Sequence, residues 1–145
     1  VYVPSGSGVT TSGFVLGFKH LGLRTRVVGV SLIWPADQVR EAIARHANRV
    51  AAELGLKTHV EPEDYDVLDY TTPGYGKITP PIVEAIRLVA AQEGVLLDPI
   101  YNGKAMAALI DHVRSGRLGK QHSAVLIHTG GTPALFHYHR ELLAE

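Results

Sequence analysis

Cysteine is absent from the 145-residue sequence, which excludes disulfide bonds and thiolate metal ligands and favours a reducing compartment such as the cytoplasm. Neither sign of charge is in excess, since 14 basic residues balance 14 acidic ones, so neither nucleic acid nor an anionic membrane is an expected partner. No apolar run approaches the length that spans a bilayer, and glycines interrupt the first apolar residues, unlike a signal peptide. With 46% hydrophobic and 19% charged residues, the composition is that of an ordinary globular domain.

The start of the sequence is unusual for a complete domain. There is no initiating methionine, and residue 1 already lies inside the apolar run Val1–Val3. Because a domain rarely begins inside a strand, we expect the sequence to be one α/β domain, residues 1–145, cut from a longer chain. The eight histidines show no spacing typical of a metal site, and no metal is expected.

Strands and helices alternate along the sequence. Apolar, β-branched runs predict strands at 1–3, 26–33, 65–70, 95–97 and 124–128. Helical spacing bounded by proline or glycine predicts helices over 10–20, 35–54, 80–93, 103–115 and 133–143. This alternation is typical of a three-layer α/β fold with a mainly parallel sheet. Since ligands bind at the carboxyl ends of parallel strands, the loops at 5–10, 98–103 and 129–132 are expected to converge on one site.

The loop SGSGVT at residues 5–10 has the composition of a phosphate cradle between a strand and a helix. Its glycines allow a close backbone approach, and N–H groups at the start of the helix bind the anion. A dinucleotide loop requires glycine where Thr11 stands and an acid after the second strand, and a P-loop requires Gly-Lys-Ser/Thr. Both patterns fail, which leaves a phosphate site or a glycine turn without a ligand.

Three stretches together resemble one family: SGSGVTTSG at 5–13, EGVLLDPIYNGKAMAALI at 93–110 and HTGGTPALF at 128–136. They resemble the C-terminal half of fold-type II (tryptophan synthase beta-like) pyridoxal-phosphate (PLP) enzymes, within the group of D-cysteine desulfhydrases and 1-aminocyclopropane-1-carboxylate (ACC) deaminases. The segment PGYG at 73–76 also matches. The resemblance implies the large cofactor-binding domain of an enzyme of roughly 300 residues. It also implies a small amino-acid substrate, a homodimer, and an N-terminal half of the same enzyme as a partner.

The resemblance implies a role for each matching position. The cofactor phosphate is held by the Thr10 hydroxyl and by the backbone amides of Gly6, Ser7, Gly8 and Val9. The other cofactor-binding positions are Asn102, Thr129 and Gly130, and the catalytic ones are Tyr75 and Tyr101. The Schiff-base lysine of the family lies in the N-terminal half, so this chain alone is expected to be catalytically incomplete. Lys104 is interpreted as a structural lysine that ties down a loop.

Two positions favour a desulfhydrase. ACC deaminases typically carry Glu and Leu where this chain has Asn102 and Thr129. A neutral hydroxyl at the ring nitrogen gives a weaker electron sink than a carboxylate, which suits β-elimination better than cyclopropane opening. The predicted function is therefore a PLP-dependent β-eliminating lyase that converts D-cysteine to pyruvate, ammonia and sulfide. ACC deamination to 2-oxobutanoate and ammonia, and a non-catalytic phosphate-binding module, remain as alternatives.

Overall fold

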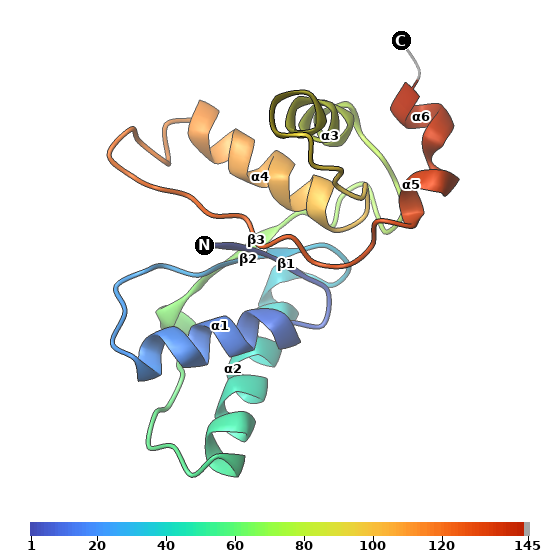
Figure 1. The fold of residues 1–145 in the computed structure, drawn as a ribbon. Coiled ribbons are helices and arrows are strands. Elements are labelled where there is room, and N and C mark those ends of the chain that lie inside the picture. Colours follow the sequence, from blue (N-terminus) through green and yellow to red (C-terminus); the bar gives the residue numbers. More distant parts are fainter. Residues whose placement is uncertain (144–145) are drawn as a thin grey trace.

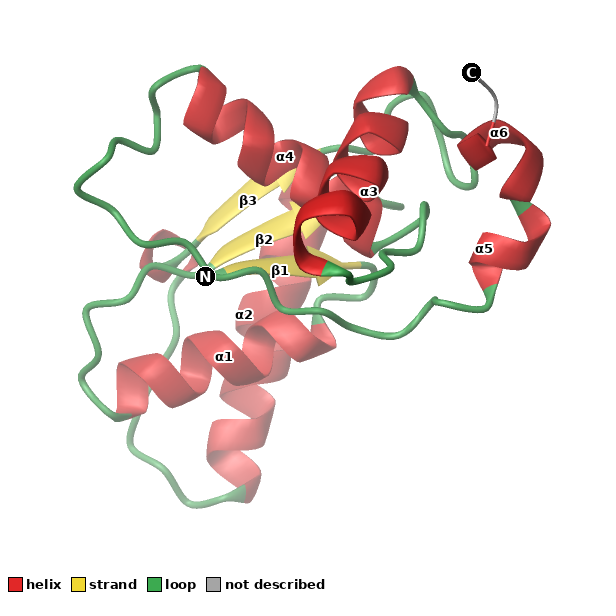
Figure 2. Ribbon diagram, turned by 45° about the horizontal axis from the view of Figure 1, so that its top comes forward, coloured by secondary structure: helices red, strands yellow, loops and turns green. Residues whose placement is uncertain are grey.

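The computed structural model describes residues 1–143, and three layers make up the fold (Figure 1). The middle layer is a parallel sheet whose strands follow the order β1 (Tyr2–Ser5), β2 (Val28–Ser31) and β3 (Asp66–Asp69). One face is covered by α1 (Val9–His20) and α2 (Ala36–Glu53), and the other by α3 (Pro80–Glu93) and α4 (Asn102–Arg114) (Figure 2). The prediction of a three-layer α/β fold with a parallel sheet is confirmed.

The remaining elements are short. A 3-10 turn, η1 (Pro62–Asp64), precedes β3, and two short helices, α5 (Ala134–His137) and α6 (His139–Leu143), lie beside α3 at the end of the described chain (Figure 1). None of the helices in residues 1–143 combines the length and the apolar content that a bilayer crossing requires.

Burial explains why the first two strands have such apolar sequences. Every residue of β1 and β2 is buried, as expected for strands covered by helices on both faces. At Gly29, in β2, an added Cβ would lie 3.0 Å from Ser5 Oγ and 3.3 Å from Thr11 Cγ2. Glycine at this position therefore allows the first turn of α1 to pack closely against the sheet.

The helix α2 turns one face to the core. In α2 the buried residues follow the four-residue spacing of one helix face: Val39, Ile43, Ala47 and Ala51. The helix α3 begins at Pro80, which needs no N–H partner there, and ends before Gly94, whose left-handed φ of 66° suits a helix end.

The predicted strand at 95–97 is wrong. No strand is found there within the described residues, and only Leu97 of the three is buried. Leu97 packs with Ile82, Ile86 and other residues of α3 and α4, so this apolar run completes the helical layer. An apolar run alone does not distinguish these two environments.

The predicted strand at 124–128 is reduced to a single parallel bridge between Leu126 and Tyr2. The Tyr2 N–H donates to Val125 O at 2.7 Å, and the Ile127 N–H donates to Tyr2 O at 2.9 Å. The next donor along β1 would be the nitrogen of Pro4, which carries no hydrogen. The ladder consequently stops after one bridge.

The predicted helix over 133–143 is divided at Tyr138 into α5 and α6. In a continuous helix the Phe136 carbonyl would accept the N–H four residues later. Here the imidazole of His139 lies 2.9 Å from that carbonyl. The Tyr138 hydroxyl donates a hydrogen bond to the carbonyl of Gly76, in the loop between β3 and α3.

Candidate functional site

The glycine loop leads from β1 into α1, and the helix begins with its amino end open. Gly8 is the N-cap, with a left-handed φ of 82°. Within the described chain no side chain caps this end, and its first turn holds no acidic residue. The first N–H groups of a helix lack partners inside the helix, and the helix dipole adds positive potential there. The amino end of α1 is thus suited to an anion.

A layer of hydroxyl contacts supports this loop from below. The buried side chains of Ser5 and Thr11 hydrogen-bond each other between β1 and α1. The Ser12 hydroxyl donates to Val9 O at 2.7 Å. At Gly8 an added Cβ would lie 2.9 Å from Ile43 Cγ1, so α2 closes the loop on that side. These contacts fix the position of the open helix end.

A cavity of about 350 Å³ lies in front of the loop. Its walls come from several segments that are far apart in the sequence: Pro4, Gly6, Ser7, Thr10, Ile33, Tyr101, Thr129 and Gly130. The volume lies within the range of small-ligand sites. Of the described residues that line it, none is acidic, so nothing in the wall repels a phosphate. The predicted convergence of the three loops is therefore found.

At the start of α4, across the cavity, the backbone N–H groups already have hydrogen-bond partners within the protein. The buried Asp98 carboxylate accepts hydrogen bonds from the backbone N–H groups of Ile100, Tyr101 and Asn102 at 2.7–2.9 Å. Its charge also complements the dipole of α4. The Asp98 side chain therefore closes this helix end. Of the two helix ends near the cavity, only that of α1 is left for a ligand.

Asn102 joins two of the loops from beneath and does not line the cavity. It is fully buried, and its Nδ2 donates to Asp98 Oδ1 at 2.6 Å and to the carbonyls of Thr129 and Gly130 at 3.2 and 3.0 Å. Its Oδ1 accepts from the Thr129 N–H at 2.9 Å and lies 3.3 Å from the Thr129 hydroxyl. The side chain therefore fixes where Thr129 faces the cavity.

Of the two predicted catalytic tyrosines, Tyr101 lines the cavity, whereas Tyr75 lies outside that lining and contacts Tyr101. The hydroxyl oxygens of Tyr75 and Tyr101 lie 3.1 Å apart, and their rings pack edge to face with centroids 6.4 Å apart. The hydrogen bond to Tyr75, together with partial burial, raises the pKa of Tyr101 to about 12. Tyr101 consequently keeps its proton throughout the neutral range.

The family described as "Pyridoxal-phosphate dependent enzyme" matches residues 1–130. The chain belongs to this family. D-cysteine desulfhydrases of Salmonella paratyphi B and Salmonella newport are each 39% identical over 139 residues, which cover 96% of this chain and 42% of theirs. A crystal structure of an ACC deaminase homologue superposes with a TM-score of 0.84 at 35% identity and covers 98% of this chain and 43% of that one.

The chain thus spans less than half the length of these PLP-family relatives. The residues present fit the cofactor of the family. The open end of α1 and the Thr10 hydroxyl suit its phosphate, and the neighbouring cavity suits a small ring. Gly6, Ser7 and Thr10 line that cavity, whereas Gly8 and Val9, the N-cap and the first residue of α1, do not.

No lysine lines this cavity among residues 1–143. Lys104 is only 2% exposed and points elsewhere, since its Nζ donates to Gly74 O at 3.1 Å and Tyr70 O at 3.4 Å. Burial lowers the pKa of its ammonium group. The interpretation of Lys104 as a residue that ties down a loop is confirmed.

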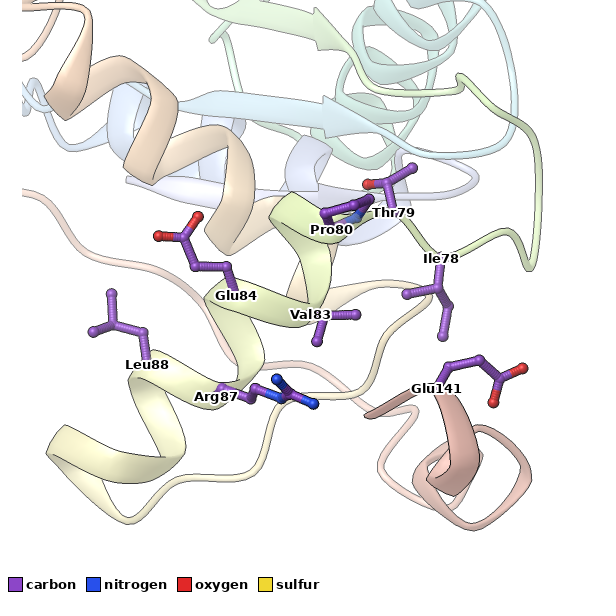
Figure 3. Close-up of a pocket in the computed structure, with 8 residues that line it drawn as sticks. All are labelled: Ile78, Thr79, Pro80, Val83, Glu84, Arg87, Leu88 and Glu141. Atoms are coloured by element: carbon purple, nitrogen blue, oxygen red, sulfur yellow. The ribbon is translucent and has the colours of Figure 1, made fainter. Parts of the chain in front are cut away.

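A second hollow, of about 750 Å³, lies between α3 and α6 (Figure 3). Its walls include Val83, Glu84 and Leu88 from α3 and Glu141 from α6, and the residues predicted for the cofactor lie outside it. The Glu84 carboxylate is paired with Arg114, with the closer contact at 2.5 Å. This hollow is larger than the cavity at the glycine loop but has none of the predicted cofactor-binding residues in its walls.

Sequence reasoning missed two contributors to the site. Ile33 forms part of the cavity wall, and the Tyr138 hydroxyl donates to Gly76 O at 2.9 Å, next to Tyr75. Ile33 ends an apolar run and resembles any core residue. Tyr138 lies 62 positions from its partner, and no local spacing signals such a contact.

Proposed function

We propose that this chain is the cofactor-binding part of a PLP-dependent β-eliminating lyase that converts D-cysteine and water to pyruvate, ammonia and hydrogen sulfide. The observation that carries the proposal is the convergence, in one cavity, of the open end of α1, the Thr129 turn and Tyr101. The relatives named as D-cysteine desulfhydrases support the choice of reaction.

The glycine loop holds the cofactor phosphate in this proposal. Backbone N–H groups of Gly6, Ser7, Gly8 and Val9 and the hydroxyl of Thr10 are the proposed donors. Donors at a helix N-terminus bind a phosphate dianion without a counter-ion from a side chain. A fixed phosphate also orients the ring in the cavity.

Thr129 is proposed to face the ring nitrogen, held there by Asn102, while Gly130 completes the cavity wall. When bound, the cofactor supplies an electron sink that stabilises negative charge at the substrate Cα. Because the Thr129 side chain is neutral, the sink is weaker than one with a carboxylate partner. Elimination of a β-thiol relieves the Cα charge by breaking the Cβ–S bond, so the weaker sink is sufficient.

Tyr75 and Tyr101 are proposed to act on the substrate as a pair. Their hydroxyls share one hydrogen bond, and this leaves the other hydroxyl proton free to point toward the substrate. Because the pKa of Tyr101 is raised to about 12, Tyr101 donates a hydrogen bond at neutral pH and does not act as a phenolate base. The departing sulfur is the proposed acceptor.

The lysine that binds the cofactor and moves the Cα proton is proposed to lie N-terminal to residue 1. The 139 aligned residues make up 42% of the relatives, whose length is therefore about 330 residues. The proposed enzyme is cytoplasmic, in line with the absence of cysteine, and it is a homodimer, as the family resemblance implies. Here "the complete protein" means the product of the whole reading frame that contains this chain.

The proposal is tested by assaying the complete protein, supplied with PLP, on two substrates. Sulfide and pyruvate released from D-cysteine would support it, and Tyr101→Phe should then lower kcat. Ammonia and 2-oxobutanoate released from ACC without sulfide from D-cysteine would reverse the choice of reaction.

ACC deamination remains the second candidate because the superposed structure is that of an ACC deaminase homologue. The two candidates differ in the demand placed on the ring nitrogen. Thr129→Leu tests this difference, since it removes the hydroxyl proposed to face the ring nitrogen and places there the residue typical of ACC deaminases. In a desulfhydrase, the change should lower sulfide release and should not create ACC activity by itself.

A further inference from the structure

The loop that carries Tyr75 connects β3 to α3 and has few hydrogen bonds of its own. Inside it the Lys77 N–H lies 3.4 Å from Gly74 O, a long contact. Two glycines flank the tyrosine with positive φ, 125° at Gly74 and 70° at Gly76. Tyr75 itself is 56% exposed, so packing alone does not fix its side chain.

The carbonyl before Tyr75 is held from the α4 side. Lys104 Nζ donates to Gly74 O at 3.1 Å and to Tyr70 O at 3.4 Å, and its stem is buried among the residues of α4 and the loop. Lys104 lies one helical turn after Tyr101, on the same side of the helix. The start of α4 therefore presents the Tyr101 hydroxyl and also fixes the loop that carries Tyr75.

The carbonyl after Tyr75, that of Gly76, is held by a residue near the C-terminal end of the described chain. The Tyr138 hydroxyl, at the junction of α5 and α6, donates to Gly76 O at 2.9 Å. An added Cβ at Gly76 would lie 3.0 Å from that same hydroxyl oxygen, so the contact requires glycine there. The division of the C-terminal helix places the tyrosine ring at this point.

We infer that Lys104 and Tyr138 are positioning residues that hold Tyr75 against Tyr101 by fixing the carbonyls on either side of it. The inference rests on the proposed function, because it gives the exposed Tyr75 a task at the substrate. Neither residue lines the cavity, and both act through Tyr75, whose hydroxyl meets that of the cavity-lining Tyr101. A shift of about 1 Å in a reacting group costs up to about 100-fold in rate.

The deciding experiment compares Tyr138→Phe with and without Tyr75→Phe in the complete protein, with sulfide release from D-cysteine as the assay. Alone, Tyr138→Phe should lower kcat about 10-fold with little change in KM. In the Tyr75→Phe background it should change kcat less than about 2-fold, because the residue it positions has lost its hydroxyl. Tyr65→Phe is the matched control, since the Tyr65 hydroxyl also donates to a carbonyl, Arg40 O at 2.5 Å, but far from the cavity.

Equal losses in both backgrounds, or no loss at all, would overturn the inference. If Tyr75→Phe alone leaves kcat unchanged, the proposed role of Tyr75 fails, and the inference fails with it. If Tyr75→Phe lowers kcat while Tyr138→Phe does not, only the inference fails.

Hydrogen exchange gives a readout that does not depend on activity. Amides of residues 74–77 should exchange faster in Tyr138→Phe and in Lys104→Met than in the parent protein. Methionine retains most of the lysine stem, which limits the loss of packing. Tyr65→Phe should leave exchange at 74–77 unchanged. Unchanged exchange in Tyr138→Phe would contradict the proposed positioning role of Tyr138, whatever the activity assay shows.

Discussion

The hydroxyl oxygens of Tyr75 and Tyr101 lie 3.1 Å apart. This contact is the main reason why the pKa of Tyr101 rises to about 12. Tyr75→Phe should therefore lower the pKa of Tyr101 toward its ordinary value of 10.0. NMR titration of ring-labelled tyrosine in the complete protein measures the change. Tyr65→Phe should leave the Tyr101 titration unmoved, and an unmoved titration in Tyr75→Phe would contradict the assigned cause.

Gly8 and Gly13 provide a matched pair for the glycine loop. Gly8→Ala forces a left-handed φ on a residue with a Cβ and places that atom 2.9 Å from Ile43, so a loss of about 1–2 kcal/mol in unfolding free energy is expected. Gly13 lies inside α1 with open space at its Cβ position, and Gly13→Ala should add about 0.5–1 kcal/mol. Urea unfolding and PLP titration measure the two effects. Only Gly8→Ala should weaken PLP binding, and equal binding by both variants would exclude a role for this loop geometry.

The sequence was sufficient for the layers of the fold and for the loops that meet. The nearly continuous apolar runs arise because β1 and β2 are buried on both faces. The glycine at position 8 indicates a left-handed turn because other residues rarely adopt that conformation. The run at 95–97 misled because burial against helices and burial in a sheet produce the same apolar pattern. Its true neighbours are set by tertiary packing, which local periodicity does not encode.

The supporting contacts of the site were harder to predict. Asn102 matched a cofactor-binding position by resemblance, yet the structure gives it the task of joining two loops beneath the cavity. Its burial depends on Asp98 and on a turn 27 positions away. A residue type at a loop position does not reveal whether its side chain faces the ligand or the protein.

Asn102 and Asn48 separate local support from general stability. Both side chains bridge backbone groups, and Asn48 pairs with both the N–H and the carbonyl of Val60 at 2.8 and 2.9 Å. Each change to alanine leaves polar groups without partners and should cost about 1–3 kcal/mol in unfolding free energy. Asn102→Ala alone should also raise the Kd for PLP, because Thr129 and Gly130 lose their support. Similar Kd values in both variants would argue against that support.

Acid sensitivity is expected from the pair formed by Arg26 and Asp66. Arg26 binds both oxygens of the Asp66 carboxylate at 2.7 Å, and this hydrogen bonding holds the pKa of Asp66 below its ordinary value of 3.8. A lowered pKa in the folded state stabilises the fold above the unfolded pKa, and this contribution is lost as the pH falls through the folded value. The two side chains are 52% and 46% exposed, so the contribution stays below about 1 kcal/mol.

Arg26→Gln should therefore reduce stability at neutral pH and leave it nearly unchanged in strong acid. Urea midpoints measured across a series of pH values follow the effect. Arg24→Gln removes the same charge two positions away and serves as the control. A loss that persists unchanged at low pH would show that Arg26 acts through its hydrogen bond to Glu63 O, at 3.0 Å, or through packing of its stem.

The open end of α1 has a practical consequence for the choice of buffer. It offers backbone donors to any tetrahedral anion of suitable size, whether or not a ring is attached. Inorganic phosphate and sulfate should therefore compete with the cofactor and wash it out during purification, whereas chloride at the same ionic strength should not. Dialysis of the complete protein into phosphate buffer or into HEPES buffer with sodium chloride, followed by measurement of retained cofactor, would reveal the difference.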